Sequence, residues 1–268
     1  MKYLNCMSIA GSDPSGGAGI QADLKTFAAL GCFGQAAVTA ITVQSTLGVR
    51  KSVALDADLV SEQVEEVWRD RIPEAVKIGL VPNAAIAEAL ARLIEQFRPP
   101  FVVWDPVLAA SSGKPLVELS DISAMLERLT PVCTLLTPNL PEALAILNTR
   151  EGEPRALARQ LSRELGGISI LLKGGHAGGP ARDVLFHEGR TSSYTSNRIS
   201  TLQTHGTGCT LSSAVAAFRA RGLPLPRAVS KAKQFVTRAL LSGRDVSSGR
   251  GTGGLNHFFA PQPSQVVE

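Results

Sequence analysis

The sequence predicts one α/β domain built on a mostly parallel sheet that is covered by helices on both faces. Short apolar runs alternate with amphipathic stretches along the whole chain, which is typical of strand–helix units. No internal repeat and no long linker divides the 268 residues, so we expect a single domain over 1–268. The composition, 44% hydrophobic and 19% charged, excludes a disordered chain.

Apolar runs bounded by polar or glycine residues predict the strands. Six are expected in the sheet, at 7–10, 36–43, 76–78, 101–104, 134–136 and 168–172. Two further runs, 184–186 and 191–195, are expected to form a hairpin that turns at Glu188 and Gly189.

Apolar residues at a spacing of three to four predict the helices between these strands. They are expected at 20–30, 58–69, from the cap Asn83 to 97, 121–129, 154–165, 207–221 and 225–241. Asn139 would cap one more helix, and Glu142 three residues later would share its face. The segment 242–254 is rich in glycine and serine and is expected to be a loop.

Charge and cysteine content narrow the possible partners and the compartment. A formal charge of +4 is mild for this length, and 5% aromatic residues argue against a platform that stacks single-stranded nucleic acid. The four cysteines are scattered without a C-x-x-C pair, which argues against zinc or a disulfide framework and favours a reducing cytoplasm. No signal peptide or membrane-length apolar run is visible, so we expect a cytoplasmic protein with no membrane or nucleic-acid partner.

Polar residues follow the predicted strands at the points where the strands end. Gln44, Asp105, Asn139 and Lys173 each come after an apolar run, and the first strand is followed by the glycine-rich stretch 11–19. In an open parallel sheet, ligands bind beyond the carboxyl ends of the strands. We therefore expect these side chains to meet at one edge of the sheet.

Two glycine motifs can be tested against their required context. Gly17 stands where a phosphate-binding P-loop needs lysine, which disfavours a P-loop NTPase. The spacing of Gly249, Gly251 and Gly254 matches a dinucleotide-binding fingerprint. It has no strand before it and no helix after it, so we interpret it as a false positive.

Gly206 and Gly208 flank Thr207 immediately before a predicted apolar helix. Backbone N–H groups at such a helix start can bind an anion, although a simple tight turn is the alternative. Lys173 could reach the same anion, and this combination indicates phosphoryl chemistry. The carboxylates of Asp105 and Glu142 would suit Mg²⁺, and helix capping by Asn139 and Glu142 is compatible with a metal bound through water.

These motifs resemble the hydroxymethylpyrimidine/phosphomethylpyrimidine kinases of thiamine biosynthesis, within the ribokinase-like superfamily. The resemblance covers nearly the whole chain. It rests on 10–23, Lys77-Ile78-Gly79, Asp105-Pro106-Val107, 137–143, Lys173-Gly174-Gly175-His176 and 204–210.

The resemblance implies a three-layer α/β/α ribokinase-like fold and a homodimer. It also implies ATP- and Mg²⁺-dependent phosphorylation of 4-amino-5-hydroxymethyl-2-methylpyrimidine and of its monophosphate. On this pattern Gln44 would bond the pyrimidine, with Gly11, Ala18, Val43, Leu80 and Val107 lining its pocket and Asp23 nearby. Asn139, Lys173, Thr204 and Lys233 would serve ATP, and Asp105 and Glu142 the metal.

The turn from Gly206 through Gly208 to Cys209 would be the anion hole of such a kinase. Sugar kinases of the superfamily carry an aspartate base at the position of Cys209. A thiol at a helix start could have a lowered pKa and act as a weak base, or it could only line the anion hole. Both alternatives remain open.

Two positions depart from the family pattern. Leu80 stands where the family often has methionine, and Ser111 stands where it often has lysine. The second change leaves open an enzyme limited to the first phosphorylation. Pyridoxal kinase activity is the nearest alternative function. A non-catalytic pyrimidine-binding protein is another, but it would need neither Lys173 nor the pair Asn139 and Glu142.

Overall fold

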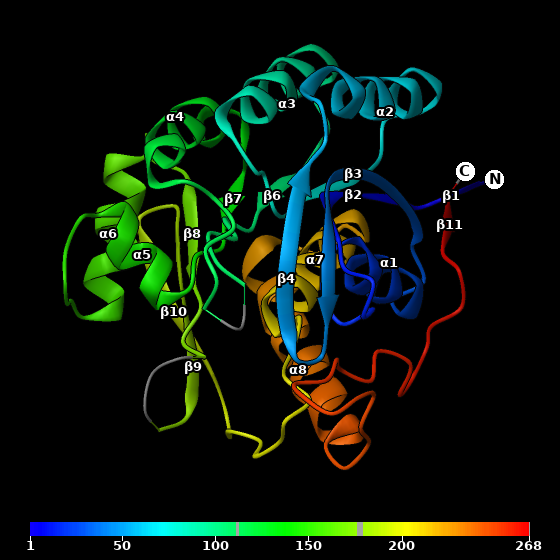
Figure 1. Ribbon diagram of the computed structural model, residues 1–268, viewed down its shortest axis with the longest axis vertical. Helices are drawn as coiled ribbons and strands as arrows, with labels where there is room; N and C mark the ends of the chain where they lie inside the picture. Colours follow the sequence, from blue (N-terminus) through cyan, green and yellow to red (C-terminus); the bar gives the residue numbers. More distant parts are fainter. Residues whose placement is uncertain (111–112, 176–178, 268) are drawn as a thin grey trace.

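The computed structural model describes residues 1–110, 113–175 and 179–267, so Ser111 and His176 lie outside the described residues. Within these ranges, nine strands form one sheet in the order β10-β9-β8-β7-β6-β5-β2-β3-β4 (Figure 1). The six central strands are parallel: β2 (Asn5–Ser12), β3 (Phe33–Ser45), β5 (Ala75–Ile78), β6 (Val102–Trp104), β7 (Leu135–Leu136) and β8 (Ser169–Leu172). The predicted parallel sheet is confirmed.

Antiparallel strands close both edges of this sheet. β4 (Gly48–Ala54) pairs with β3, and the hairpin of β9 (Ala181–His187) and β10 (Arg190–Ser196) pairs with β8. The hairpin turns at Glu188 and Gly189, as predicted, and both residues have positive φ (48° and 74°). Such a pair of angles matches the right-handed twist of the flanking strands.

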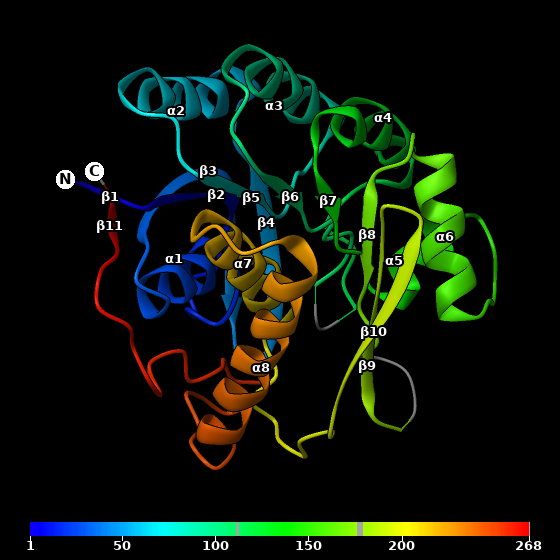
Figure 2. The same cartoon turned by 180° about the vertical axis from the view of Figure 1, so that it is seen from behind.

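Helices cover both faces of the sheet and produce three layers (Figures 1 and 2). One face carries α2 (Ala57–Asp70), α3 (Ala84–Phe97), α4 (Leu119–Leu129), a short 3₁₀ turn (Thr130–Val132), α5 (Leu140–Ile146) and α6 (Pro154–Glu164). The other face carries α1 (Gly19–Ala29), α7 (Thr207–Ala220) and α8 (Leu225–Gly243). None of these helices has the length and apolar character needed to cross a membrane.

Successive side chains of each central strand point to opposite faces of the sheet, so the molecule has two hydrophobic cores, one on each face. On β5, Val76 and Ile78 enter the core beneath α2 to α6, whereas Ala75 enters the core beneath α1, α7 and α8. The next residue on that second face is Lys77, which is completely buried. Central strands buried on both faces therefore read as continuous apolar runs in the sequence.

Three strands were not predicted. β4 is an edge strand that contains Arg50 and Lys51, so it lacks a continuous apolar run. β1 (Lys2–Tyr3) and β11 (Val266–Val267) pair with one another near the two chain ends and are too short to show periodicity. The predicted helix ends differ from the structure by a few residues only.

Residues 249–254 form a strap that crosses the turn of the β3–β4 hairpin. Thr252 N donates to Thr46 O at 2.9 Å, and Gly251 N donates to Thr46 Oγ1 at 3.1 Å. A Cβ atom on Gly251 would overlap the Thr46 carbonyl, and one on Gly254 would lie 2.9 Å from Gly17 Cα. The glycines of the apparent dinucleotide motif therefore allow close backbone packing.

Candidate active site

Lys173, Asp105, Glu142 and Gly208 meet at the carboxyl edge of the sheet. Lys173 directly follows β8, Asp105 follows β6, and Glu142 lies in the first turn of α5. The Lys173 ammonium is paired with Asp105 Oδ1 and lies 4.0 Å from Glu142 Oε2. A Cβ on Gly208 would be 3.3 Å from Lys173 Nζ and 3.7 Å from Asp105 Oδ2. The predicted phosphate residues are therefore brought together.

The charges in this cluster are strongly coupled. Burial raises the pKa of Glu142 to about 7; Lys173 opposes this shift and Asp105 adds to it. Burial alone would lower the pKa of Lys173, but Asp105 and Glu142 raise it above its usual value. One permanent ammonium thus stands between two carboxyl groups, which leaves the cluster receptive to a further cation.

Local backbone structure holds Asn139 and Lys173 in place. Asn139 Oδ1 accepts from Glu142 N at 2.9 Å, and Glu142 Oε2 accepts from Asn139 N at 2.7 Å, which completes a capping box. Lys173 N donates to Pro138 O at 2.8 Å. The predicted capping role is confirmed, and it orients the Glu142 carboxylate toward Lys173.

The turn that precedes α7 has the geometry of an anion site. Gly206 has φ of 80°, and a Cβ on it would overlap the carbonyl oxygen of Gly17, so only glycine fits. Thr204 stabilises the turn through its carbonyl, which accepts from Thr207 N at 3.2 Å and from Thr207 Oγ1 at 2.7 Å. The amides of Gly208 and Cys209 precede the helical hydrogen-bond ladder and are directed out of the helix start.

Of the two alternatives for Cys209, the structure favours a thiol that lines the anion hole. Burial raises the pKa of the thiol above its usual value; Lys77 opposes the shift, and Asp23 and Asp105 add to it. Loss of hydration outweighs the effect of the helix start because two carboxylates also lie nearby. The thiol is therefore protonated at neutral pH.

A second cluster joins Gln44, His205 and Asp13. The Gln44 amide and the Asp13 carboxylate both lie 2.8 Å from His205 Nε2. Asp13 also accepts from the backbone amides of Ser15 and Ala18, each at 2.8 Å. Burial acts to raise the Asp13 pKa, but the bonds from His205 and Ser15 dominate and lower it to about 2. The carboxylate is ionised and fixes the glycine-rich loop.

Other predicted pocket residues lie along neighbouring strand ends. A Cβ on Gly11 would be 3.1 Å from Leu80 Cδ2, so these two residues are in contact. Val107 N donates to the carbonyl of Asp105 at 2.8 Å. Val43 pairs with Lys51 across the β3–β4 hairpin, and its side chain is 38% exposed.

Asp23 lies beneath the site and has no exposed surface. Its carboxylate accepts from Ser8 Oγ at 2.6 Å, Lys77 Nζ at 2.8 Å and Ser213 Oγ at 2.7 Å. Its side of α1 faces the core beneath α1 and α7, yet its charge acts on the Cys209 thiol. Its predicted place near the substrate stays a prediction.

Lys233 reaches the phosphate side indirectly. Its Nζ donates to Asp183 Oδ2 at 2.8 Å, and Asp183 Oδ1 accepts from Gly174 N at 2.9 Å. Asp183 was not predicted, nor were Asp13, His205 and Lys77. For His205 the available signal was its place in the motif 204–210, between residues that were assigned roles.

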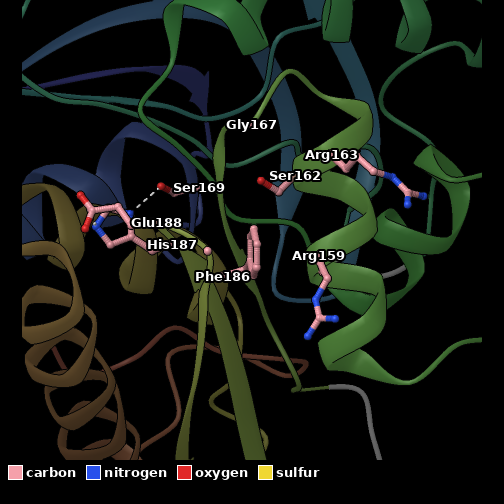
Figure 3. Close-up of a pocket in the computed structure, with 9 residues that line it drawn as sticks. Arg159, Ser162, Arg163, Gly167, Ser169, Phe186, His187 and Glu188 are labelled. Atoms are coloured by element: carbon pink, nitrogen blue, oxygen red, sulfur yellow. Dashed lines mark hydrogen bonds and ion pairs between the residues drawn. The ribbon is translucent and has the colours of Figure 1, made fainter.

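Two cavities differ in their relation to this edge. One of 210 Å³ lies beside Lys173 and is lined also by Leu140, Leu172 and Arg182. The larger, of 330 Å³, lies at the β9–β10 turn, between α6 and the hairpin (Figure 3). There the guanidinium group of Arg163 points away from Ser169 and His187. The larger cavity is lined by none of the predicted site residues, whereas the smaller adjoins the phosphate cluster.

Among the described residues, no group of three or more His, Cys, Asp or Glu side chains could hold a metal by itself. Asp105 and Glu142 supply two carboxylates at most. Mg²⁺ commonly uses one or two protein carboxylates and completes its shell with water and substrate phosphate. The donor set fits that kind of magnesium binding and does not fit an all-protein cage.

Comparisons with known proteins agree with this geometry. A family model described as phosphomethylpyrimidine kinase matches residues 13–256. The hydroxymethylpyrimidine/phosphomethylpyrimidine kinase of Escherichia coli K12 is 40% identical over 264 residues, 97% of this chain and 99% of that protein.

Solved structures of vitamin kinases are also similar to this chain. The crystal structure of phosphomethylpyrimidine kinase from Clostridium difficile 630 has a TM-score of 0.78 and 35% identity, over 88% of this chain and 99% of that one. An ADP complex of Bacillus subtilis pyridoxal kinase has a TM-score of 0.81 and 32% identity, over 89% and 92% of the two chains.

Proposed function

The chain belongs to the phosphomethylpyrimidine kinase family, and on that premise we propose that it phosphorylates 4-amino-5-hydroxymethyl-2-methylpyrimidine and then its monophosphate, with ATP, in thiamine biosynthesis. The chain is a phosphotransferase with a ribokinase-like fold.

One observation carries the proposed chemistry. Lys173 Nζ adjoins Gly208 at the N-terminus of α7, so a fixed positive charge and outward backbone amides face the same space. Phosphoryl transfer depends mainly on positioning and on neutralising charge on the transferred group. The arrangement supports that task, and simple binding of a neutral pyrimidine would not need it.

The substrate hydroxymethyl group would lie beside the turn from Gly206 to Cys209. Its oxygen attacks the γ-phosphorus of ATP in line, ADP leaves from the opposite side, and the hydroxyl proton passes to an oxygen of the transferred phosphoryl group and then to water. Lys173 and the amides of Gly208 and Cys209 stabilise the transferred group. Cys209 lines the hole as a protonated thiol, because a loose transition state places little demand on a base.

Asp105 and Glu142 would hold Mg²⁺, which supplies charge neutralisation on the ATP phosphates when it is bound. Asn139 orients Glu142 through the capping box. Lys233, through Asp183, holds the backbone beside Lys173. Thr204 shapes the anion turn through its carbonyl, so its role toward ATP would be indirect.

The pyrimidine would lie between Gln44 and the strand ends that carry Gly11, Leu80 and Val107. Ala18 N is fixed by Asp13, which keeps the glycine-rich loop close to this space. Val43 would lie at the rim of this space, because it is 38% exposed.

Pyridoxine phosphorylation is the second candidate function. The Bacillus subtilis neighbour named pyridoxal kinase shares the fold at 32% identity over 89% of this chain. The same anion turn could serve either alcohol, so the distinction depends on the heterocycle side of the pocket.

Product analysis by mass spectrometry tests the proposal. Hydroxymethylpyrimidine, its monophosphate and pyridoxine are each incubated with the protein and Mg·ATP. We expect phosphate on both pyrimidines and much slower transfer to pyridoxine. Absence of product from hydroxymethylpyrimidine would overturn the proposed function, and product from the first step alone would restrict it to one phosphorylation.

The variant Lys173→Met separates catalysis from binding in the same assay. Loss of one charge that stabilises the transition state should lower kcat about 10²–10³-fold and change the affinity for the pyrimidine little.

Removal of Mg²⁺ with a chelator should abolish turnover. His187→Gln is the matched control for Lys173→Met and should retain wild-type kcat, because His187 ends β9 beside Ser169, at the end of β8 opposite to Lys173.

We extend the proposal to the whole molecule as one kinase domain that forms a cytoplasmic homodimer. The exposed apolar residues Ile41, Val43 and Val53 on the β3–β4 hairpin support pairing with a second copy. The four free cysteines support a reducing compartment. Sedimentation of the wild type against Ile41→Glu should show a dimer and a monomer, respectively.

A further inference from the structure

His205 has one ring nitrogen that faces two partners at once. Nε2 lies 2.8 Å from Asp13 Oδ2 and 2.8 Å from the side-chain amide of Gln44. Asp13 already accepts two backbone N–H bonds, from Ser15 and Ala18, so it is an ionised acceptor. A bare nitrogen facing that carboxylate would be repelled, and therefore Nε2 carries a hydrogen.

The hydrogen on His205 Nε2 determines which end of the Gln44 amide faces it. The structure records Gln44 Nε2 on the side of His205 Nε2. Two N–H donors cannot face one another, so the hydrogen-bond network requires the amide to be turned, with Oε1 toward His205. The oxygen and nitrogen of a glutamine amide have nearly the same shape, so either end fits the space and the hydrogen count decides. The ring hydrogen is then shared between Asp13 and Gln44.

Thr42 gives the same orientation independently. Its hydroxyl has one hydrogen, which goes to Ser12 O at 2.9 Å. The hydroxyl oxygen lies 3.4 Å from the end of the Gln44 amide that is turned away from His205. The structure records Oε1 at that end. Because the hydroxyl hydrogen already goes to Ser12, Oε1 has no donor there, whereas Nε2 of the turned amide can donate to Thr42.

We propose that His205, fixed by Asp13, is a positioning residue that locks the Gln44 amide in one orientation and thereby sets which heterocycle the kinase prefers. The inference deepens the proposed function, because it rests on Gln44 contacting the substrate ring. With the amide locked, one N–H and one oxygen lone pair of Gln44 remain for the ligand. The amine and adjacent ring nitrogen of an aminopyrimidine complement this pair, whereas pyridoxine has no adjacent amine and ring nitrogen.

The backbone around His205 supports the same role. His205 N donates to Gly253 O at 2.9 Å, and a Cβ on Gly17 would overlap the imidazole ring. The His205 side chain is 11% exposed and is held between the strap and the glycine-rich loop. Its orientation is therefore fixed before substrate arrives.

Nuclear magnetic resonance of ¹⁵N-histidine-labelled protein without substrate tests the hydrogen count. The His205 signals, assigned by their loss in His205→Gln, should show a protonated Nε2. Gln44→Glu should keep that state, because a carboxylate is also an acceptor. An unprotonated Nε2 in the wild type would overturn the proposal, whether or not the protein is active.

Kinetics with two substrates tests the consequence. His205→Phe keeps a ring and removes the donor, so KM for hydroxymethylpyrimidine should rise at least about tenfold, with kcat within about twofold. KM for pyridoxine should stay constant, and the preference should fall by the same factor. Equal losses for both substrates would show a merely structural role and overturn the proposal.

Two variants complete the test. If His205→Phe does not fold, Thr42→Val removes the other contact that orients the amide and should lower the same preference, and an unchanged preference would overturn the proposal. His187→Gln is the control, because His187 bonds Ser169 at 2.9 Å far from this cluster and should change neither KM. A wild type inactive on the pyrimidine would refute the proposed function, while the resonance measurement would still decide the orientation.

Discussion

Lys77 and Asp23 form an ion pair of 2.8 Å that has no exposed surface on either side chain. The pair joins β5 to α1, and Ser8 and Ser213 add hydrogen bonds to the carboxylate from β2 and α7. The carboxylate of Asp23 thus ties together β5, α1, β2 and α7 beneath the anion turn. The positive charge of Lys77 also acts on Cys209, because it lowers the pKa of the thiol against the larger effect of burial.

Removing Lys77 alone should be more harmful than removing the pair. Lys77→Met leaves a buried carboxylate without its counter-charge, so the free energy of unfolding should fall by roughly 3–5 kcal/mol. The double variant Lys77→Met/Asp23→Leu should recover most of that loss. Urea denaturation measures both, and equal losses in the single and double variants would contradict this explanation.

The variant Gly206→Ala should destroy the anion turn. Alanine would have to adopt φ of 80° and would overlap the Gly17 carbonyl, so kcat/KM should fall at least about 100-fold. Gly222→Ala is the matched control, since Gly222 has φ of 81° and nothing within 4 Å of an added Cβ. It should lose about 1 kcal/mol of stability and keep its activity. Comparable activity in the two variants would argue against a specific role for the turn.

The Cys209→Ala variant should lower kcat about tenfold and leave folding intact, because the thiol lines the site. Since the Cys209 pKa is raised by burial, wild-type kcat should show no inflection from a thiolate between about pH 6 and 8. Stopped assays across that range measure the profile. An inflection that disappears in Cys209→Ala would assign a base role to the thiolate.

His257 should make stability depend on pH. Burial is the main reason that its pKa falls from 6.5 to about 4, and Lys25 adds to the shift. The unfolded chain therefore takes up the proton first as the pH falls. The contribution of His257 to the free energy of unfolding is fully present above pH 6.5. It is lost as the pH falls from 6.5 to about 4, and the loss is roughly 3 kcal/mol.

Denaturation at several pH values, compared with His257→Gln, measures this contribution. The variant should lose the decline between pH 6.5 and 4. Asp13, with its pKa lowered to about 2, acts in a separate window below pH 3.8. An unchanged slope in His257→Gln would show that another group titrates.

The central sheet could be predicted because its strands are buried on both faces and appear as apolar runs. β4 could not, because an edge strand with one exposed face mixes Val49 and Val53 with Arg50 and Lys51. The cap at Asn83 was predictable from local sequence, and the structure confirms it at 3.0 Å to Ile86 N.

Part of the candidate site could be predicted from the sequence, and part of it could not. Lys173, Asp105 and Glu142 follow strands, and the parallel topology alone brings them to one edge. Asp13, Gln44 and His205 come from the end of β3 and from two loops far apart in the sequence. Nothing in their spacing indicates that Asp13 and Gln44 both contact His205 Nε2. The complete burial of Asp23 could not be predicted, because the spacing of a helix does not say which of its faces meets the sheet.

The strap at 249–254 has a consequence for the order in which the molecule is made. His205 and Thr46 obtain backbone hydrogen bonds from residues that leave the ribosome long after the glycine-rich loop at 13–18. The sheet can form on the nascent chain before the strap emerges, because domains fold as their segments appear. The backbone around the substrate end of the site is therefore among the last parts of the molecule to be completed during synthesis.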